Sequence, residues 1–334
     1  MKIILFLTLF AININGFGQT AGEYFMSGIE KFAHQDYIGA IADFNNAIEL
    51  KPDNALCYRM RGNSKRNLED YRGAIADYNK SIELTPDDAD TFSERGQAKA
   101  TIEDYKGALE DYTKAIELKH KVEAYNGRGI VKNMLHDYNG AMADFNKAIE
   151  LKPDFVEAYV NRGNAKRKLQ DNTGAIADYN KSIELKPDIS TTYFCRGIAK
   201  FNLEDYRGAI ADYNKSIEIK PDEEAYNNRG IANANLQDYG RAMADYNNAI
   251  ELKPNFAEAF NNRGNTKRNL EDYRGAIADY TKAIELKPDF ARPYFSRGKI
   301  KIVIGQKDSG CLDFSKAGEL GDMEAYDLIK KYCN

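Results

Sequence analysis

Glycine recurs at a nearly constant interval through most of this chain, and that interval constrains the fold more than any other feature. Nine glycines lie 34 residues apart, or 33 at two intervals, and arginine precedes each one except the first, where Ser27 stands. A fixed period of this length is typical of a solenoid, in which each unit packs on its neighbours and none folds alone. We therefore predict one continuous repeat array. The glycines are Gly28, Gly62, Gly96, Gly129, Gly163, Gly197, Gly230, Gly264 and Gly298.

Each repeat carries the same set of small and aromatic residues. With the glycine numbered as position 8, positions 4 and 24 are aromatic in every unit, position 20 is alanine in the first eight, and position 32 is proline in seven. Large aromatic side chains fill the space left by small residues where two helices approach closely. Proline ends a helix before the next unit begins. Pairs such as Asp70-Tyr71 mark the turn between two helices, where aspartate suits the N-cap.

This pattern resembles the tetratricopeptide repeat (TPR), whose signature is an aromatic residue at position 4, glycine at 8, alanine at 20, an aromatic residue at 24, alanine at 27 and proline at 32. The resemblance covers residues 21–324. It implies an all-α, right-handed superhelical solenoid of nine helix-turn-helix repeats, with a C-terminal capping helix over residues 325–334. The expected units are 21–54, 55–88, 89–121, 122–155, 156–189, 190–222, 223–256, 257–290 and 291–324.

The first eighteen residues differ from the repeats. Lys2 precedes an apolar stretch from Ile3 to Ile14, and Gly16-Phe17-Gly18 supplies the small residues that a signal peptidase requires. We predict a signal peptide over residues 1–18, which makes this an exported bacterial member of the family, either periplasmic or secreted. Membrane contact is then only transient. The alternative is an uncleaved anchor or a buried helix.

The four cysteines fit an exported protein. Cys311 and Cys333 lie 22 residues apart in the segment that must cap the array, and an oxidising compartment permits a disulfide between them. The alternative is two free thiols. Cys57 and Cys195 occupy different repeat positions, and we interpret them as small apolar core residues.

Charge and motifs exclude several classes of function. The formal net charge is −4 and acidic and basic residues are interleaved, whereas a nucleic-acid-binding protein shows a basic face or stripe. The three histidines have no metal-ligand spacing with the cysteines. No phosphate-binding loop or nucleophile motif is present. We predict no enzyme activity, no metal and no cofactor.

Charged residues recur at three repeat positions, and at two of them, positions 7 and 11, the charge is unusual for the family. Arginine stands at position 7 in eight units, lysine at position 11 in all but the seventh, where Asn233 replaces it, and aspartate at position 23 throughout. At 100° per residue, positions 7 and 11 lie opposite the face formed by positions 2, 5, 6, 9, 12 and 13. We predict a structural ion-pair ladder rather than a basic groove. It includes Asp43, Arg61, Asp77, Arg95, Asp178, Arg196, Asp279 and Arg297.

Two pairings of this ladder are open. Pairing within a unit leaves Asp43 facing only Ser27. Pairing forward to the next unit, as in Asp43–Arg61 and Asp279–Arg297, uses every arginine and places Lys331 opposite Asp313. We favour the forward arrangement.

The opposite face of the first helix in each unit is rich in asparagine. An amide offers both donors and acceptors, so a row of asparagines can bind the backbone of an extended peptide. Part of the row resembles the asparagine ladder in the TPR domain of O-linked N-acetylglucosamine transferases. The alternative is a solvated helix face. The predicted partner-binding residues are Asn63, Arg66, Asn126, Asn161, Asn164, Arg167, Asn227, Asn228, Asn261, Asn262, Asn265 and Arg268.

A longer period overlies the short one. The sequence Arg-Gly-Asn-x-Lys-Arg occurs at residues 61–66, 162–167 and 263–268, at intervals of 101 residues. The chain therefore resembles a duplicated block of three units, whether or not the duplication serves function. The chaperone-binding carboxylate clamp of some TPR proteins is rejected, because Glu94 and Gly127 stand where its amide and basic residues belong.

The resemblance and the groove residues together indicate a non-catalytic scaffold. We predict that it binds a protein or extended peptide in its concave groove, in envelope assembly or as an adaptor. The alternative function is an accessory glycan-binding or secretion-system subunit.

Overall fold

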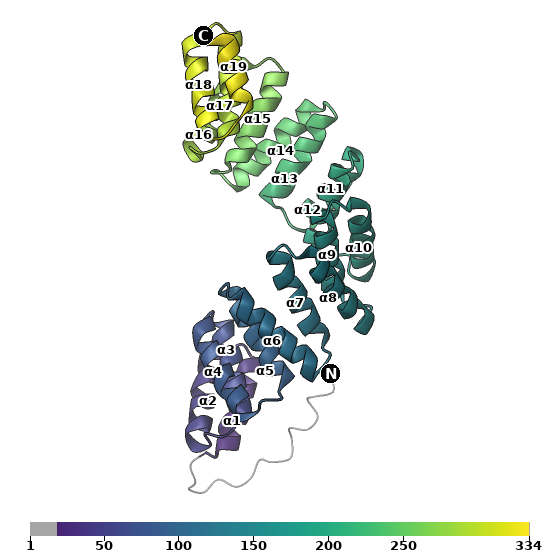
Figure 1. The fold of residues 1–334 in the computed structure, drawn as a ribbon, viewed down its shortest axis with the longest axis vertical. Helices are drawn as coiled ribbons and strands as arrows, with labels where there is room; N and C mark the ends of the chain where they lie inside the picture. The colour runs from purple at the N-terminus through teal and green to yellow at the C-terminus, as the bar shows by residue number, and fades with distance from the viewer. Residues whose placement is uncertain (1–18, 334) are drawn as a thin grey trace. The chain divides into compact units, whose positions relative to one another are not determined.

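The computed structural model describes residues 19–333, and every regular element in that range is an α-helix. The predicted signal peptide lies outside the described residues. Helices alternate along the chain as antiparallel pairs, with an odd-numbered helix of 13 residues followed by an even-numbered helix of 14 in the first eight pairs. The ninth pair is followed by one shorter helix, α19. The all-α TPR solenoid predicted from the period is confirmed (Figure 1).

Two compact units divide the chain between Pro153 and Asp154. The first unit holds four pairs in which each helix packs on the next one along the chain. Its helices are α1 (Ala21–Ala33), α2 (Tyr37–Leu50), α3 (Ala55–Asn67), α4 (Tyr71–Leu84), α5 (Ala89–Thr101), α6 (Tyr105–Leu118), α7 (Val122–Met134) and α8 (Tyr138–Leu151).

The second unit holds five pairs and the terminal helix, packed in the same sequential way. Its helices are α9 (Val156–Lys168), α10 (Asn172–Leu185), α11 (Ser190–Asn202), α12 (Tyr206–Ile219), α13 (Glu223–Asn235), α14 (Tyr239–Leu252), α15 (Ala257–Asn269), α16 (Tyr273–Leu286), α17 (Ala291–Val303), α18 (Lys307–Glu319) and α19 (Glu324–Tyr332).

Aspartate caps the second helix of a pair, as the Asp-Tyr motif predicts. In α4 the side chain of Asp70 accepts a hydrogen bond of 2.9 Å from the backbone amide of Gly73. The residue before the cap, Glu69, has a positive φ of 62°, which turns the chain sharply between the helices. The first eight pairs share this turn, and in the ninth Gly305 takes the positive φ while Gln306 makes no side-chain cap.

The recurring glycine provides space for the aromatic ring at position 24. A Cβ atom on Gly163 would lie only 2.7 Å from Cε1 of Tyr179, which is fully buried. The third pair is the exception, because a Cβ on Gly96 would lie 3.3 Å from Tyr112. The Tyr112 ring instead abuts Gly127 of the next pair, where a Cβ would come within 2.5 Å. The predicted packing of an aromatic ring on the recurring glycine is thus confirmed, except that the Tyr112 ring lies against Gly127 of the next pair.

The ion-pair ladder exists, but the forward pairing is wrong. Arg61 donates to Asp77 of its own pair at 2.9 and 2.5 Å, and Lys65 approaches the same carboxylate at 2.8 Å. Asp43 accordingly accepts from Ser27 at 2.6 Å and pairs with Lys31 at 2.7 Å. The antiparallel hairpin places positions 7 and 11 of its first helix against position 23 of its second. Each predicted arginine therefore binds the aspartate sixteen residues after it, as in Arg95–Asp111, Arg196–Asp212 and Arg297–Asp313. The remaining predicted aspartates, Asp178 and Asp279, bind Arg162 and Arg263 of their own pairs.

The same correction applies at the end of the array. Asp313 is held by Arg297 and Lys301 at 2.7 and 2.8 Å, and Lys331 instead lies over the ring of Tyr332. The aspartate needs no cation from the cap, because its own hairpin supplies two.

Within each unit, ladder arginines also reach back to the preceding hairpin. The third nitrogen of Arg61 donates to Asn45 of α2 at 2.6 Å, and Arg196 donates in the same way to Asn180 of α10. One guanidinium thus joins three helices, and the ladder couples neighbouring hairpins in addition to holding each one closed.

The predicted disulfide between Cys311 and Cys333 is present and ties α19 to α18. Ala325 of α19 is fully buried in a cluster with Phe295 and Phe314. Cys57 and Cys195 are free thiols, and Cys57 is fully buried, as expected of a core residue.

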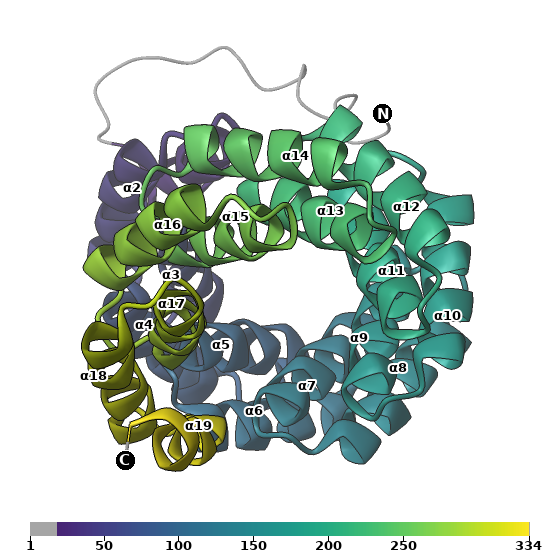
Figure 2. The ribbon, with the colours of Figure 1, turned by 90° about the horizontal axis from the view of Figure 1, so that it is seen from above.

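The first, odd-numbered helix of each pair lies on the inner side of its unit. Contacts join α13 to α15 and α15 to α17, whereas no contact of similar extent joins successive even-numbered helices within either unit. Figure 2 shows α11, α13 and α15 on the inner side of the second unit, with α12, α14 and α16 outside them. The asparagine-rich face therefore belongs to the inner helices. Within residues 19–333, no helix has the length and apolar character needed to cross a membrane.

Candidate functional site

A groove lies between α13 and α15 on the inner side of the second unit. It consists of two pockets, of about 440 and 210 Å³. The pockets are lined by residues 224, 228, 231 and 235 of α13 and by residues 258, 262, 265 and 269 of α15. Successive members of each set lie about one helical turn apart, so each set forms a stripe along its helix. We call this the α13–α15 groove. The larger pocket is lined by Glu224, Asn227, Asn228, Lys253, Asn255, Phe256 and Glu258, and the smaller by Ile231, Ala234, Asn235, Tyr246, Asn262, Asn265, Thr266 and Asn269.

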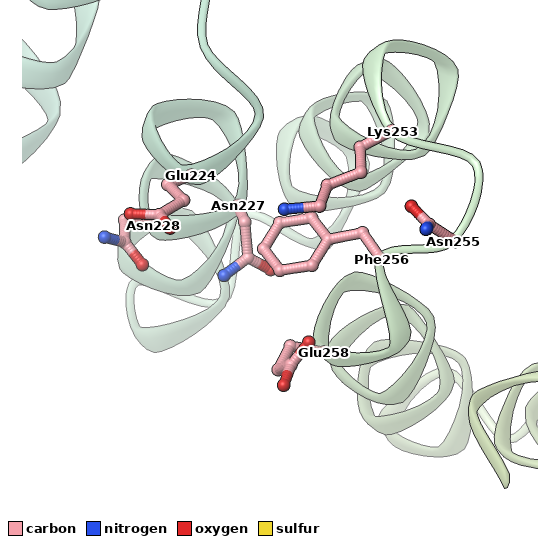
Figure 3. Close-up of a pocket in the computed structure, with 7 residues that line it drawn as sticks. All are labelled: Glu224, Asn227, Asn228, Lys253, Asn255, Phe256 and Glu258. Atoms are coloured by element: carbon pink, nitrogen blue, oxygen red, sulfur yellow. The ribbon is translucent and has the colours of Figure 1, made fainter. Parts of the chain in front are cut away.

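The larger pocket is built around the ring of Phe256, in the loop that precedes α15. Figure 3 shows the side chain of Asn227 beside this ring and Lys253 along it. The Lys253 ammonium lies 5.0 Å from the ring centroid and 3.0 Å from a carboxylate oxygen of Glu223. The Glu223 backbone amide and then Lys253 lower the pKa of the Glu223 carboxyl. The pocket thus combines one aromatic wall with amides and charges of both signs.

Three asparagines are joined to each other across the groove. Nδ2 of Asn262 donates to Oδ1 of Asn227 at 3.0 Å, and Nδ2 of Asn261 donates to Oδ1 of Asn262 at 3.3 Å. Oδ1 of Asn261 is buried and has no hydrogen-bond partner. Asn227 and Asn261 are both almost fully buried, so Asn228 and Asn262 are the more accessible amides of this group.

In the smaller pocket, tertiary contacts orient the amides. Oδ1 of Asn265 accepts a hydrogen bond of 2.8 Å from the Tyr280 hydroxyl, which fixes which end of that amide is the acceptor. Nδ2 of Asn235 donates to the carbonyl of Ile231 at 2.9 Å, which fixes the donor end of that amide. A groove lined in this way can both donate to and accept from a polar backbone.

The predicted partner-binding residues do not all lie in this groove. Asn227, Asn228, Asn262 and Asn265 line the two pockets. Asn126 lies on α7, Asn161, Asn164 and Arg167 on α9, and Arg268 on α15. Asn63 and Arg66 lie on α3 and donate to side chains of α5, to Glu94 and Gln97 respectively. Partner binding by the whole set stays a prediction.

Sequence reasoning missed the residues that the loop before α15 contributes. Lys253, Asn255 and Phe256 line the larger pocket, yet none lies on the inner face of a first helix. A signal was present, because Phe155, Phe256 and Phe290 all occur two residues after the proline of their repeats. Glu224 and Glu258, at the start of their helices, were also missed.

Ionisable side chains in the described part of the chain do not form a metal centre. No group of three or more histidine, cysteine, aspartate or glutamate side chains is placed to hold an ion within residues 19–333.

Sequence models of the tetratricopeptide repeat match residues 156–189, 191–223, 223–256 and 257–290, and models described as TPR repeat match residues 62–102 and 135–169. Together these matches span more than half of the chain. No curated protein sequence matches the chain closely enough to count as a relative.

Among solved structures, a tetratricopeptide repeat protein from Parabacteroides merdae is similar, with a TM-score of 0.59 and 21% identity over 74% of this chain and 99% of the other. The C-terminal part of a TPR repeat-containing protein from Cytophaga hutchinsonii gives a TM-score of 0.56 and 20% identity over 71% of this chain and 98% of its own. At these identities the similarity shows the fold.

Proposed function

Because the chain belongs to the tetratricopeptide repeat family, we propose that it is a non-catalytic scaffold that binds an extended segment of a partner protein in the α13–α15 groove. TPR proteins bind peptides or proteins. The observation that carries the proposal is the row of amides from Asn228 to Asn269, which runs through two adjoining pockets between the inner helices.

The chemistry of the groove suits a peptide backbone. An extended segment presents alternating carbonyl and amide groups, and asparagine both accepts and donates hydrogen bonds. The Phe256 ring adds an apolar wall at one end. Amides outnumber charged residues in the smaller pocket, so backbone contacts would supply affinity with little demand on side-chain sequence.

The proposed compartment is the bacterial envelope or the exterior, where the protein would act in assembly or as an adaptor. The charged, apolar and small-residue pattern of residues 1–18 supports export. The disulfide between Cys311 and Cys333 also supports it, because such bonds persist in oxidising compartments. Mass spectrometry of the protein recovered from cells tests this proposal, with an N-terminus at Gln19 expected and an intact Met1 in a cytosolic fraction contradicting it.

A peptide-display selection with the mature chain tests the binding function. Peptides selected on the protein are labelled, and their Kd is measured by fluorescence anisotropy against Asn228→Ala and Asn262→Ala. Each substitution removes an accessible groove amide and should weaken binding by about tenfold. The matched control is Asn139→Ala on the exposed side of α8, which should leave the Kd unchanged.

Two results would overturn the proposal. Equal Kd values for the groove variants and for Asn139→Ala would place peptide binding elsewhere. Saturable binding to a glycan array, abolished by Asn228→Ala and Asn262→Ala while no peptide is selected, would favour the alternative glycan-binding subunit.

A further inference from the structure

Three tyrosine–asparagine–arginine groups recur on the inner side of the array at intervals of 101 residues. In each, the tyrosine hydroxyl of a second helix donates to Oδ1 of an asparagine on the first helix, at 2.7, 2.7 and 2.8 Å. The arginine follows the asparagine by three residues and lies about one turn along the same helix. We call these groups the triads. They are Asn63, Arg66 and Tyr78; Asn164, Arg167 and Tyr179; and Asn265, Arg268 and Tyr280.

The tyrosine sets the direction of the asparagine amide. Because Oδ1 accepts from the hydroxyl, the Nδ2 group is the end that is left to donate. Burial raises the pKa of these tyrosine hydroxyls, so they remain protonated donors at neutral pH. Each triad therefore presents an amide donor and a guanidinium close together, which is a combination suited to an anionic acceptor.

The first triad shows what such a pair binds, because the chain supplies the acceptors itself. Nδ2 of Asn63 donates to Oε1 of Glu94 at 3.0 Å, and Arg66 donates to the side-chain oxygen of Gln97. Glu94 and Gln97 both lie on α5, the first helix of the next pair. The neighbouring helix thus closes this triad with a carboxyl group.

The second and third triads have no such acceptors. Where Glu94 stands, the next pairs carry Cys195 and Ser296, and where Gln97 stands they carry Ile198 and Lys299. None of these four side chains has a carboxylate. Nε of Arg167 is buried with no hydrogen-bond partner, and the bond from Arg268 to Asn269 is long, at 3.4 Å.

The triad arginines therefore differ from those of the ladder. All eight ladder arginines lie within 2.7 Å of an aspartate oxygen. In the described part of the chain, neither Arg167 nor Arg268 has a carboxylate within ion-pair distance. The chain has more acidic than basic residues, so a shortage of carboxylates does not explain why these two arginines have no acidic partner.

We propose that an acidic side chain of the bound partner takes the place of Glu94 at the second and third triads, accepting from Asn164 and Arg167 or from Asn265 and Arg268. This inference rests on the proposed function and adds that the partner segment is acidic. Lys299, which stands at the repeat position of Gln97, adds a second cation to the third triad's neighbouring helix, α17. The acidic groove residues Glu224 and Glu258 lie near the N-terminal ends of their helices. Along α15, Glu258 is about 10 Å from Asn265 at 1.5 Å per residue.

Two labelled peptides test the inference on the mature chain: a decapeptide of alternating serine and glutamate, and its counterpart with glutamine for glutamate. We expect the glutamate peptide to bind at least about tenfold more tightly, because hydrogen bonds to a charged acceptor are the stronger kind. The double variant Arg167→Gln/Arg268→Gln should remove the difference. The matched control Arg66→Gln should not change the ratio of the two Kd values, because Glu94 and Gln97 already occupy the first triad.

A gain-of-carboxylate variant provides a second test that does not depend on removing charge. Cys195→Glu places a glutamate at the position of Glu94 in the second triad, and it should weaken binding of the glutamate peptide while the helical circular dichroism stays unchanged. Free glutarate at the same carboxylate concentration should compete poorly, since a partner segment adds groove contacts that the small dicarboxylate lacks.

The inference is overturned if the two peptides bind equally, if Arg66→Gln weakens binding as much as the double variant, or if glutarate competes as well as the peptide. These outcomes are distinct from failure of the proposed function. Loss of affinity for display-selected peptides on Asn228→Ala and Asn262→Ala would still place a partner in the α13–α15 groove.

Discussion

Arg61 binds Asp77, sixteen residues further along the same helical pair, through two hydrogen bonds of 2.9 and 2.5 Å. Its remaining nitrogen donates to Asn45 of the preceding pair at 2.6 Å. Every later pair of helices repeats the bond between its own arginine and aspartate. The charges that look like a basic stripe in the sequence are therefore neutralised inside the array, and they hold each hairpin closed.

Removing one ladder aspartate should strand two cations. Asp178 accepts from Arg162 at 2.5 Å and from Lys166 at 2.8 Å, and only 5% of its side chain is exposed. Asp178→Ala should lower the free energy of unfolding by about 3 kcal/mol, the lower end of the cost of breaking a buried pair. Urea denaturation followed by circular dichroism measures this change.

The matched control is Glu184→Ala, which breaks the exposed pair with Lys181 one helical turn away. Such surface pairs contribute about 0.5 kcal/mol or less. Equal effects of the two substitutions would show that the ladder contributes no more than a surface ion pair.

Adding one methyl group at the recurring glycine should have a different effect in different repeats. In Gly163→Ala the new Cβ would lie 2.7 Å from the Tyr179 ring, so we expect a loss of about 2 kcal/mol from overpacking. In Gly96→Ala the distance to Tyr112 is 3.3 Å, and the gain of about 1 kcal/mol in helix propensity should offset the tight contact. Thermal unfolding of both variants checks the prediction, and an equal loss in the two would contradict the role assigned to the ring.

High pH should destabilise the protein through its buried tyrosines. Burial raises the pKa of Tyr112 to about 12, from an ordinary value of 10.0. Between these values the unfolded chain releases the proton whereas the folded chain retains it, so stability falls as pH rises, by about 1.4 kcal/mol per pH unit for each such group.

Tyr112→Phe should remove the contribution of one tyrosine to this loss of stability at high pH. Phenylalanine already occupies the same repeat position at Phe44 and Phe145, so we expect little change at pH 7 and a smaller loss of stability above pH 10. Denaturation midpoints at pH 7, 10 and 11 provide the measurement. A variant that loses stability as steeply as the parent would argue against a contribution from this hydroxyl.

Reduction of the disulfide should loosen the C-terminal helix. The bridge between Cys311 and Cys333 closes a loop of 22 residues, for which a stabilisation of about 3 kcal/mol is expected. In Cys311→Ser/Cys333→Ser, amides of α19 should exchange faster with solvent, while those of α1 at the other end should not change. Unaltered exchange in α19 would mean that the packing of Ala325 suffices to hold it.

The local features of the repeat could be predicted from sequence because they depend on neighbouring positions. The glycine period predicts the solenoid, and the Asp-Tyr motif predicts the turn that Glu69 and Asp70 form. The cysteine spacing and the terminal position predict the bridge that ties α19 to α18. Each of these features depends on helix geometry or on residues that are close together in the chain, so the sequence is enough to predict it.

The pairing of the ladder and the use of the asparagines depended on tertiary structure. In this periodic chain, an aspartate lies 16 residues after one arginine and 17 or 18 before the next, and the pattern alone does not choose between them. The antiparallel hairpin chooses the first, because it brings Arg61 against Asp77. Likewise Asn63 and Asn265 occupy the same repeat position, yet only Asn63 meets a carboxyl group, because Glu94 lies on the helix packed beside it. The sequence alone therefore determines the helices and their period, and packing between helices decides which side chains are left to meet a partner.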